Sequence, residues 1–171
     1  MSNKLIEFFM IPIVFFLLLI DGQISTLATN WSVDSLVVSS HLLLMVAIFY
    51  ANYVSLKYSF LVFMFLGLVY DTIYFRFLGI ATTLFPLIVV SIYFFYQAIE
   101  YKRGVNILVL LVSIFQFELI SYIFARIFQI THLSLFNFVF TALFPSLVFN
   151  IILFFILQPF FERLFGIINK T

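Results

Sequence analysis

The sequence contains no cysteine and very few charged residues. Without cysteine the chain has no disulfide, no thiolate nucleophile and no cysteine ligand for a metal. Charged residues make up 9% of the chain, whereas a soluble globular domain carries about 25%. The net charge of +1 also argues against a nucleic-acid partner, which a strongly basic surface would bind. The composition therefore excludes a soluble domain and indicates an integral membrane protein.

Glycine and proline are scarce as well, with five and four residues, and 65% of the chain is hydrophobic. The apolar residues form long unbroken runs, which excludes the alternating pattern of a membrane β-barrel. A helical crossing needs roughly 20 mainly apolar residues, so the length leaves no room for a soluble domain. We predict an all-α membrane protein with one polytopic domain over residues 1–171. Its six predicted transmembrane helices cover residues 5–20, 36–53, 60–74, 80–98, 105–128 and 135–157.

Short polar breaks separate the predicted helices. The first helix is expected to end at Asp21 and Gly22, and Trp31 in the following connection is suited to the headgroup layer. His41 and His132 each lack a second histidine or a carboxylate at ligand spacing, so neither predicts a metal site.

Lysine and arginine predict the orientation of the chain, because positive charge near helix ends is retained on the cytoplasmic side. With the N-terminus inside, six of the eight basic residues are cytoplasmic and only Arg76 and Arg126 lie outside. We therefore predict that the N-terminus and the C-terminus are both inside. Asp71 and Glu118 then belong to the outer half of the bilayer.

The most polar part of an apolar region is GLVYDTIYFRFLGI, residues 67–80. Gly67, Asp71 and Tyr74 share one helix face, and the glycine lets another helix approach closely. One interpretation of Asp71 is a ligand, ion or proton site. The favoured interpretation is structural: Asp71 caps the reversal that ends at Gly79 by binding backbone amides or Arg76. A lone carboxylate is a poor catalyst, and Asp71→Asn is therefore expected to be mild.

Glu118, Tyr122 and Arg126 follow at intervals of four residues and lie along one side of the fifth predicted helix. Three interpretations stay open. They form one polar ladder within the helix; or Arg126 reaches the outer headgroups while Glu118 pairs with another helix or a partner protein; or the row serves transport.

The last predicted helix contains Pro145, Ser146 and Asn150. Proline leaves the carbonyl one turn earlier without its helical donor. We expect Ser146 or Asn150 to satisfy that carbonyl or to hydrogen-bond a neighbouring helix.

Enzyme motifs such as HExxH, GxSxG and the P-loop are absent from the sequence. The seven acidic residues are scattered along the chain. We therefore predict no catalytic residue, no metal site and no cofactor.

Two segments resemble the MreD family of rod shape-determining proteins: residues 67–80, with Gly-Leu, Asp and Leu-Gly, and FPSLVFNIILFFILQPFFERL, residues 144–164. In the second segment Pro145, Asn150 and Pro159 are at the matching positions. The bulky residues 75–77 depart from the family's pattern. The resemblance implies a non-enzymatic scaffold of the bacterial cell membrane that contacts lipids and binds MreC. It also implies that the protein cooperates with the transpeptidase and glycosyltransferase of peptidoglycan synthesis and, in rod-shaped cells, with MreB.

The resemblance further implies the six-helix fold of the substrate-binding components of vitamin ECF transporters. A substrate-binding subunit for a vitamin or other small molecule is therefore the alternative function. The short outer loops offer few hydrogen-bonding side chains for a polar ligand, which favours the scaffold.

Overall fold

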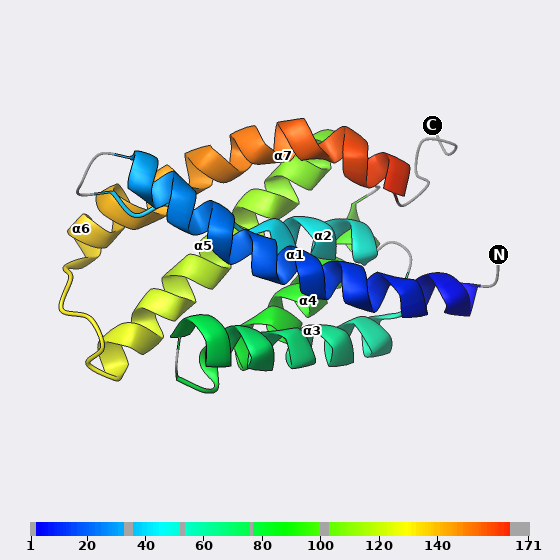
Figure 1. The fold of residues 1–171 in the computed structure, drawn as a ribbon, viewed down its shortest axis with the longest axis horizontal. Helices are drawn as coiled ribbons and strands as arrows, with labels where there is room; N and C mark the ends of the chain where they lie inside the picture. The colour runs from blue at the N-terminus through cyan, green and yellow to red at the C-terminus, as the bar shows by residue number, and fades with distance from the viewer. Residues whose placement is uncertain (1–2, 33–35, 52–53, 76, 100–102, 165–171) are drawn as a thin grey trace.

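The computed structural model describes residues 3–32, 36–51, 54–75, 77–99 and 103–164, and these residues form helices without a strand (Figure 1). Two five-residue π-helical turns interrupt the α-helices: η1 (Asp71–Phe75) extends α3, and η2 (Val139–Leu143) joins α6 to α7. The helices are α1 (Asn3–Trp31), α2 (Leu42–Tyr50), α3 (Leu56–Tyr70), α4 (Ile80–Ala98), α5 (Arg103–Ile127), α6 (Leu135–Phe138) and α7 (Phe144–Leu164).

In the described part of the chain, five helical rods are long and apolar enough to cross a bilayer, and they cover Pro12–Trp31, Leu56–Tyr74, Ile80–Ala98, Gly104–Ile127 and Leu135–Arg163. This confirms the predicted all-α membrane protein. The α4 helix has the predicted bounds, and α3 and α5 lie close to theirs. The last rod continues beyond residue 157, through Pro159 to Leu164.

The second predicted helix, 36–53, is wrong over much of its length. Residues 36–41 are not helical, and α2 has only nine residues, all of them buried. At 1.5 Å per residue such a helix is about 14 Å long, less than half of the roughly 30 Å hydrocarbon layer. Residues 36–50 nevertheless return from the end of α1 toward the end of the molecule where α1 begins (Figure 1). The return path thus consists of a non-helical part followed by a short helix.

The first predicted helix ends too early, because α1 continues past residue 20 to Trp31. Asp21 and Ser25 accept hydrogen bonds from the backbone of the return path. These polar residues therefore face the protein interior instead of a loop in water, and the helix does not need to end there.

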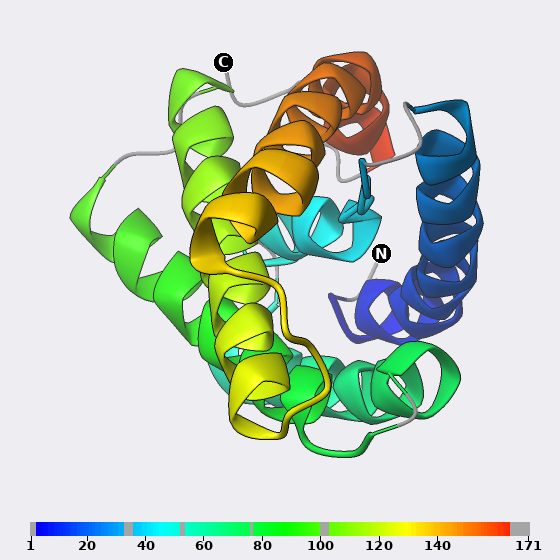
Figure 2. The same cartoon turned by 90° about the vertical axis from the view of Figure 1, so that its left-hand side faces the viewer.

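The α2 helix lies in the middle of the bundle, and α1 stands at one edge of it (Figure 2). The α1 helix begins and α7 ends at the same end of the molecule (Figure 1). The non-helical segment passes between α1 and α7, and this placement creates the polar cluster described next.

Candidate functional site

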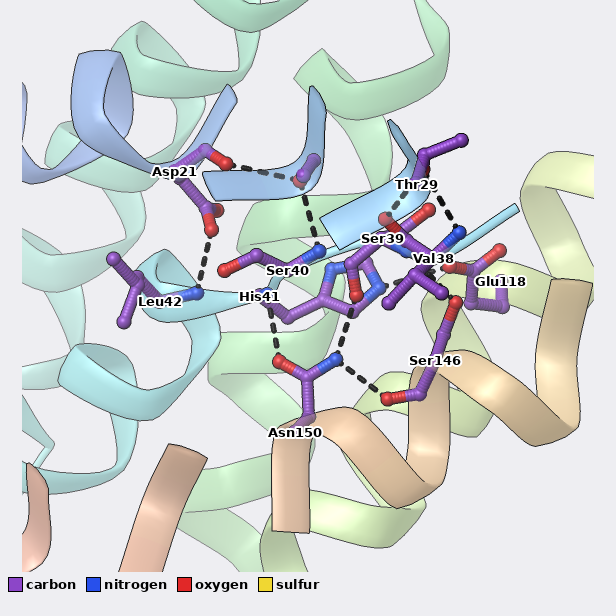
Figure 3. A network of polar contacts seen from close by, with 11 residues as sticks. Asp21, Thr29, Val38, Ser39, Ser40, His41, Leu42, Glu118, Ser146 and Asn150 are labelled. Atoms are coloured by element: carbon purple, nitrogen blue, oxygen red, sulfur yellow. Dashed lines mark hydrogen bonds and ion pairs between the residues drawn. The ribbon is translucent and has the colours of Figure 1, made fainter. Parts of the chain in front are cut away.

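Residues 36–41, which we call the linking segment, carry backbone amides through an apolar region without a helix to bond them. Unpaired backbone groups at membrane depth cost several kcal/mol each, so non-helical backbone is tolerated there only where the protein satisfies it. In this protein the partners come from α1 on one side and from the rod of η2 and α7 on the other (Figure 3).

The α1 side consists of Asp21, Ser25 and Thr29, which are four residues apart and share one helix face. Each accepts a hydrogen bond from the amide of a residue in or directly after the linking segment. Val38 donates to Thr29 Oγ1 at 3.0 Å, Ser40 to Ser25 Oγ at 2.8 Å, and Leu42 to Asp21 Oδ1 at 2.9 Å.

The spacing of these three bonds has a geometric cause. Four residues of an α-helix rise about 6 Å, and two residues of extended chain rise about 6.6 Å. A polar residue at every fourth helix position therefore stays level with every second amide of an extended neighbour. The four-residue spacing on α1 therefore matches the two-residue spacing of the amides that it binds.

The α7 side binds the intervening amides. Val37 donates to the Thr141 carbonyl at 2.8 Å, Ser39 to Ser146 Oγ at 2.9 Å, and His41 to Asn150 Oδ1 at 2.8 Å. Asn150 Nδ2 also donates to the carbonyls of Ser39 and Ser146, both at 2.7 Å. We call the bonds on both sides of the linking segment the ladder.

Pro145 explains why the Thr141 carbonyl is available. A proline has no N–H, so the carbonyl four residues earlier loses its helical donor. The amide of Val37 takes that place at 2.8 Å. The freed carbonyl expected from the sequence is thus satisfied by the linking segment, while Ser146 and Asn150 bond other residues of that segment.

His41 also joins the ladder to α5. Its Nε2 lies 2.9 Å from Glu118 Oε1, and the two side chains are 4% and 12% exposed. Tyr122 donates instead to the Leu133 carbonyl at 2.8 Å, and Arg126 is exposed. Among the three interpretations of this row, the geometry is that of Glu118 paired with another part of the chain.

The sequence-based search missed Asp21, Ser25, Thr29 and His41. The apolar run before Asp21 predicts a helix end there, and the sequence around His41 offers no metal ligand that would mark this histidine. The sequence does mark Asp21 and His41, because an ionisable residue within an apolar run requires a partner in the protein. The spacing of Asp21, Ser25 and Thr29 was also visible.

Asp71 forms a second polar cluster, at the hairpin between α3 and α4, and its side chain is fully buried. Its Oδ2 accepts from the amides of Gly79 at 2.8 Å and Thr82 at 3.0 Å, and from Thr82 Oγ1 at 2.7 Å. Its Oδ1 accepts from the amide of Ala81 at 2.7 Å. Asp71 therefore satisfies amides at the start of α4 that have no helical acceptor. Arg76 lies outside the described residues.

Gly67 and Gly79 make this geometry possible. A Cβ added to Gly67 would lie 2.4 Å from the Ala81 carbonyl oxygen, so α3 and α4 approach closely only because this position is glycine. Gly79 has φ of 117°, in the left-handed region that favours glycine. Both glycines are thus required by backbone geometry.

Tyr74 connects this cluster to α1. Its hydroxyl donates to the Leu18 carbonyl at 3.1 Å. A Cβ added to Gly22 would meet the Tyr74 ring at 2.2 Å, so the ring packs directly over that glycine. Gly22 was expected to end a helix, whereas it makes room for Tyr74 within α1.

Chemically, both clusters hold backbone in place. The Asp71 carboxylate serves four donors, and Glu118 pairs with His41. Within the described part of the chain, no group of three or more histidine, aspartate or glutamate side chains is arranged to hold a metal ion.

Comparison with known protein families identifies a family for this chain. A family model described as rod shape-determining protein MreD matches residues 2–168 of the 171-residue chain. No curated protein and no solved structure matches, so the expected likeness to vitamin-transporter components stays a prediction. Since the family match spans nearly the whole chain, which is built of membrane-crossing helices, the chain belongs to the MreD family, whose role is rod shape determination.

Proposed function

We propose that this protein is a non-enzymatic scaffold in the bacterial cell membrane that binds the membrane-spanning helix of MreC. Through MreC it helps to organise the transpeptidase and glycosyltransferase that extend peptidoglycan. Family membership supports a role in rod shape determination. The start of α1 and the end of α7 lie at the same end of the molecule, which supports termini on the same side of the membrane. The lysine and arginine distribution supports the inside for both.

A groove on the membrane-facing side is the observation that best supports this proposal. It lies between the last turns of α1 and the rod of η2 and α7, over the start of the linking segment, and its volume is about 600 Å³. Pro145 and three phenylalanines of the η2 and α7 rod line one side, and the α1 side carries the small residues Ala28 and Ser32. Transmembrane helices pack closely where such residues lie at the interface. The groove is therefore suited to an apolar helix.

The ladder explains why this groove is both open and apolar. The linking segment stands between α1 and α7 and keeps the two helices apart. Its amides bond sideways to these helices, so the groove surface is left with side chains such as Leu36 and Val38. Trp31, at the end of α1, is 86% exposed beside the groove. A partner helix entering here meets almost no unpaired polar group.

Filling the groove tests the proposal. Ala28→Leu places a larger side chain in the groove, and we expect about tenfold less MreC to co-purify from native membranes, because a helix can no longer approach closely. Ala98→Leu, at the exposed end of α4, is the matched control and should leave recovery unchanged. Gel filtration in detergent checks that both variants fold.

Undiminished MreC recovery with folded Ala28→Leu protein would contradict this docking site. A vitamin or an energy-coupling ATPase recovered in place of MreC would contradict the scaffold itself and favour the substrate-binding subunit.

A further inference from the structure

A second groove lies on the other side of α1, and it is different in kind. It runs between residues 12–19 of α1 and residues 58–66 of α3, and its volume is about 630 Å³. Residues 58–66 span about 12 Å at the rise of an α-helix. We propose that this groove binds an acyl chain of an anionic phospholipid, in the leaflet on the side where α1 and α3 begin.

The lining favours a flexible chain over a helix. Phe15, Phe16 and Phe65 are among its side chains, and leucines from both helices supply much of the rest. Among the described residues that line it, none is glycine, alanine, serine or threonine. Close helix packing in membranes uses such small residues. A flexible acyl chain fits a lining without such small residues, whereas a helix needs them to approach closely.

Charge at the mouth of the groove indicates the headgroup. Lys57 is exposed in the first turn of α3 and precedes the lining residue Leu61 by one helical turn. No acidic side chain pairs with it in the part of the chain that the structure describes. A lysine at this level attracts the negatively charged headgroups of a membrane surface. Charge complementarity therefore selects an anionic phospholipid over a zwitterionic one.

Tyr58 adds a polar contact at the same level. It lines the groove directly after Lys57, and its hydroxyl has no hydrogen-bond partner among the described residues. A tyrosine at a membrane interface places its ring among acyl chains and its hydroxyl among polar groups. The Tyr58 hydroxyl is thus available to the ester or phosphate oxygens of the lipid whose chain fills the groove.

Quenching by brominated lipids tests the assignment. The sole tryptophan is removed by Trp31→Phe, and a new one is introduced by Phe65→Trp inside the groove. The control is Leu87→Trp on α4, since Leu87 is 53% exposed and Phe65 57%. Each protein is reconstituted with acyl-brominated phosphatidylglycerol or acyl-brominated phosphatidylcholine.

We expect the Phe65→Trp protein to bind the anionic lipid about fivefold more tightly than the zwitterionic one, the factor for one lysine near the membrane surface. The Leu87→Trp protein should show no preference. Lys57→Gln should remove the preference, and Lys57→Arg should retain it.

Equal quenching by both lipids in the Phe65→Trp protein, or an unchanged preference in Lys57→Gln, would overturn the assignment. Loss of quenching when MreC is added would place a helix in this groove and would also overturn it. Native mass spectrometry of the unsubstituted chain and of Lys57→Gln, counting retained phosphatidylglycerol, gives the same test if Phe65→Trp does not fold.

Discussion

The Asp71 cluster and the ladder meet the same physical requirement in two ways. Both satisfy backbone groups that have no helical partner in an apolar environment. At the hairpin of α3 and α4, one carboxylate serves four donors that lie within eleven residues of it. In the ladder, several side chains each serve one to three backbone groups, and the bond between His41 and Asn150 joins residues 109 apart. One arrangement is local and the other ties distant helices together.

This difference predicts how each cluster fails. Loss of the carboxylate should release the start of one helix, whereas loss of a central ladder residue should release the linking segment from α7. The three substitutions below test this contrast, and the expected effects decrease from the first to the third.

Asn150→Leu should have the largest effect. Leucine has a similar volume but leaves the His41 amide and the Ser39 carbonyl without their partners. Each unsatisfied buried group costs about 1–3 kcal/mol, so we expect a loss of about 2–6 kcal/mol in the free energy of unfolding. Equilibrium unfolding in mixed detergent and SDS micelles measures it. The control Asn137→Leu, at an exposed position of α6, should change stability by no more than about 0.5 kcal/mol. Equal losses in both variants would contradict the ladder.

Asp71→Asn should have an intermediate effect. The sequence alone predicts a mild change, but the geometry alters that expectation because both carboxylate oxygens accept hydrogen bonds. An amide offers one oxygen, and its NH₂ group would face an N–H donor. We expect a loss of about 1–3 kcal/mol in the same unfolding assay.

Unchanged stability in Asp71→Asn would show that one oxygen is sufficient for the cap. Loss of cell-shape function with normal stability and normal protein level would reveal a role for the negative charge itself.

Thr82→Val should have the smallest effect. It removes one of the four donors to Asp71 and keeps the side-chain shape, while the three amides still bind the carboxylate. We expect a loss of about 0.5–1.5 kcal/mol. Thr83→Val is the control, since the Thr83 hydroxyl bonds only carbonyls one turn back in its own segment. A loss as large as that of Asp71→Asn would mean that the hydroxyl, and not the amides, dominates the cap.

The sequence predicted the local arrangement well and the distant one poorly. Apolar runs locate most of the membrane-crossing helices, because hydropathy reports the burial of a helix in lipid. Gly67 and Asp71 were identified because their partners lie along the same hairpin. The linking segment falls within a predicted helix, since only Ser39, Ser40 and His41 separate the apolar stretches LVV and LLLMVAIFY. Hydropathy does not distinguish amides that bond within a helix from amides that bond to serine and asparagine more than 100 residues away.

The distance along the chain between the linking segment and α7 has a consequence for biosynthesis. His41 is made 109 residues before Asn150. At about 5–20 residues per second, the ribosome needs roughly 5–20 s to reach Asn150 after it has passed His41. During that interval α1 is already present to bind Val38, Ser40 and Leu42, but the other amides of the segment have no partner from α7. The nascent protein therefore passes through a half-assembled stage in the membrane, which is completed only when its last helix is inserted.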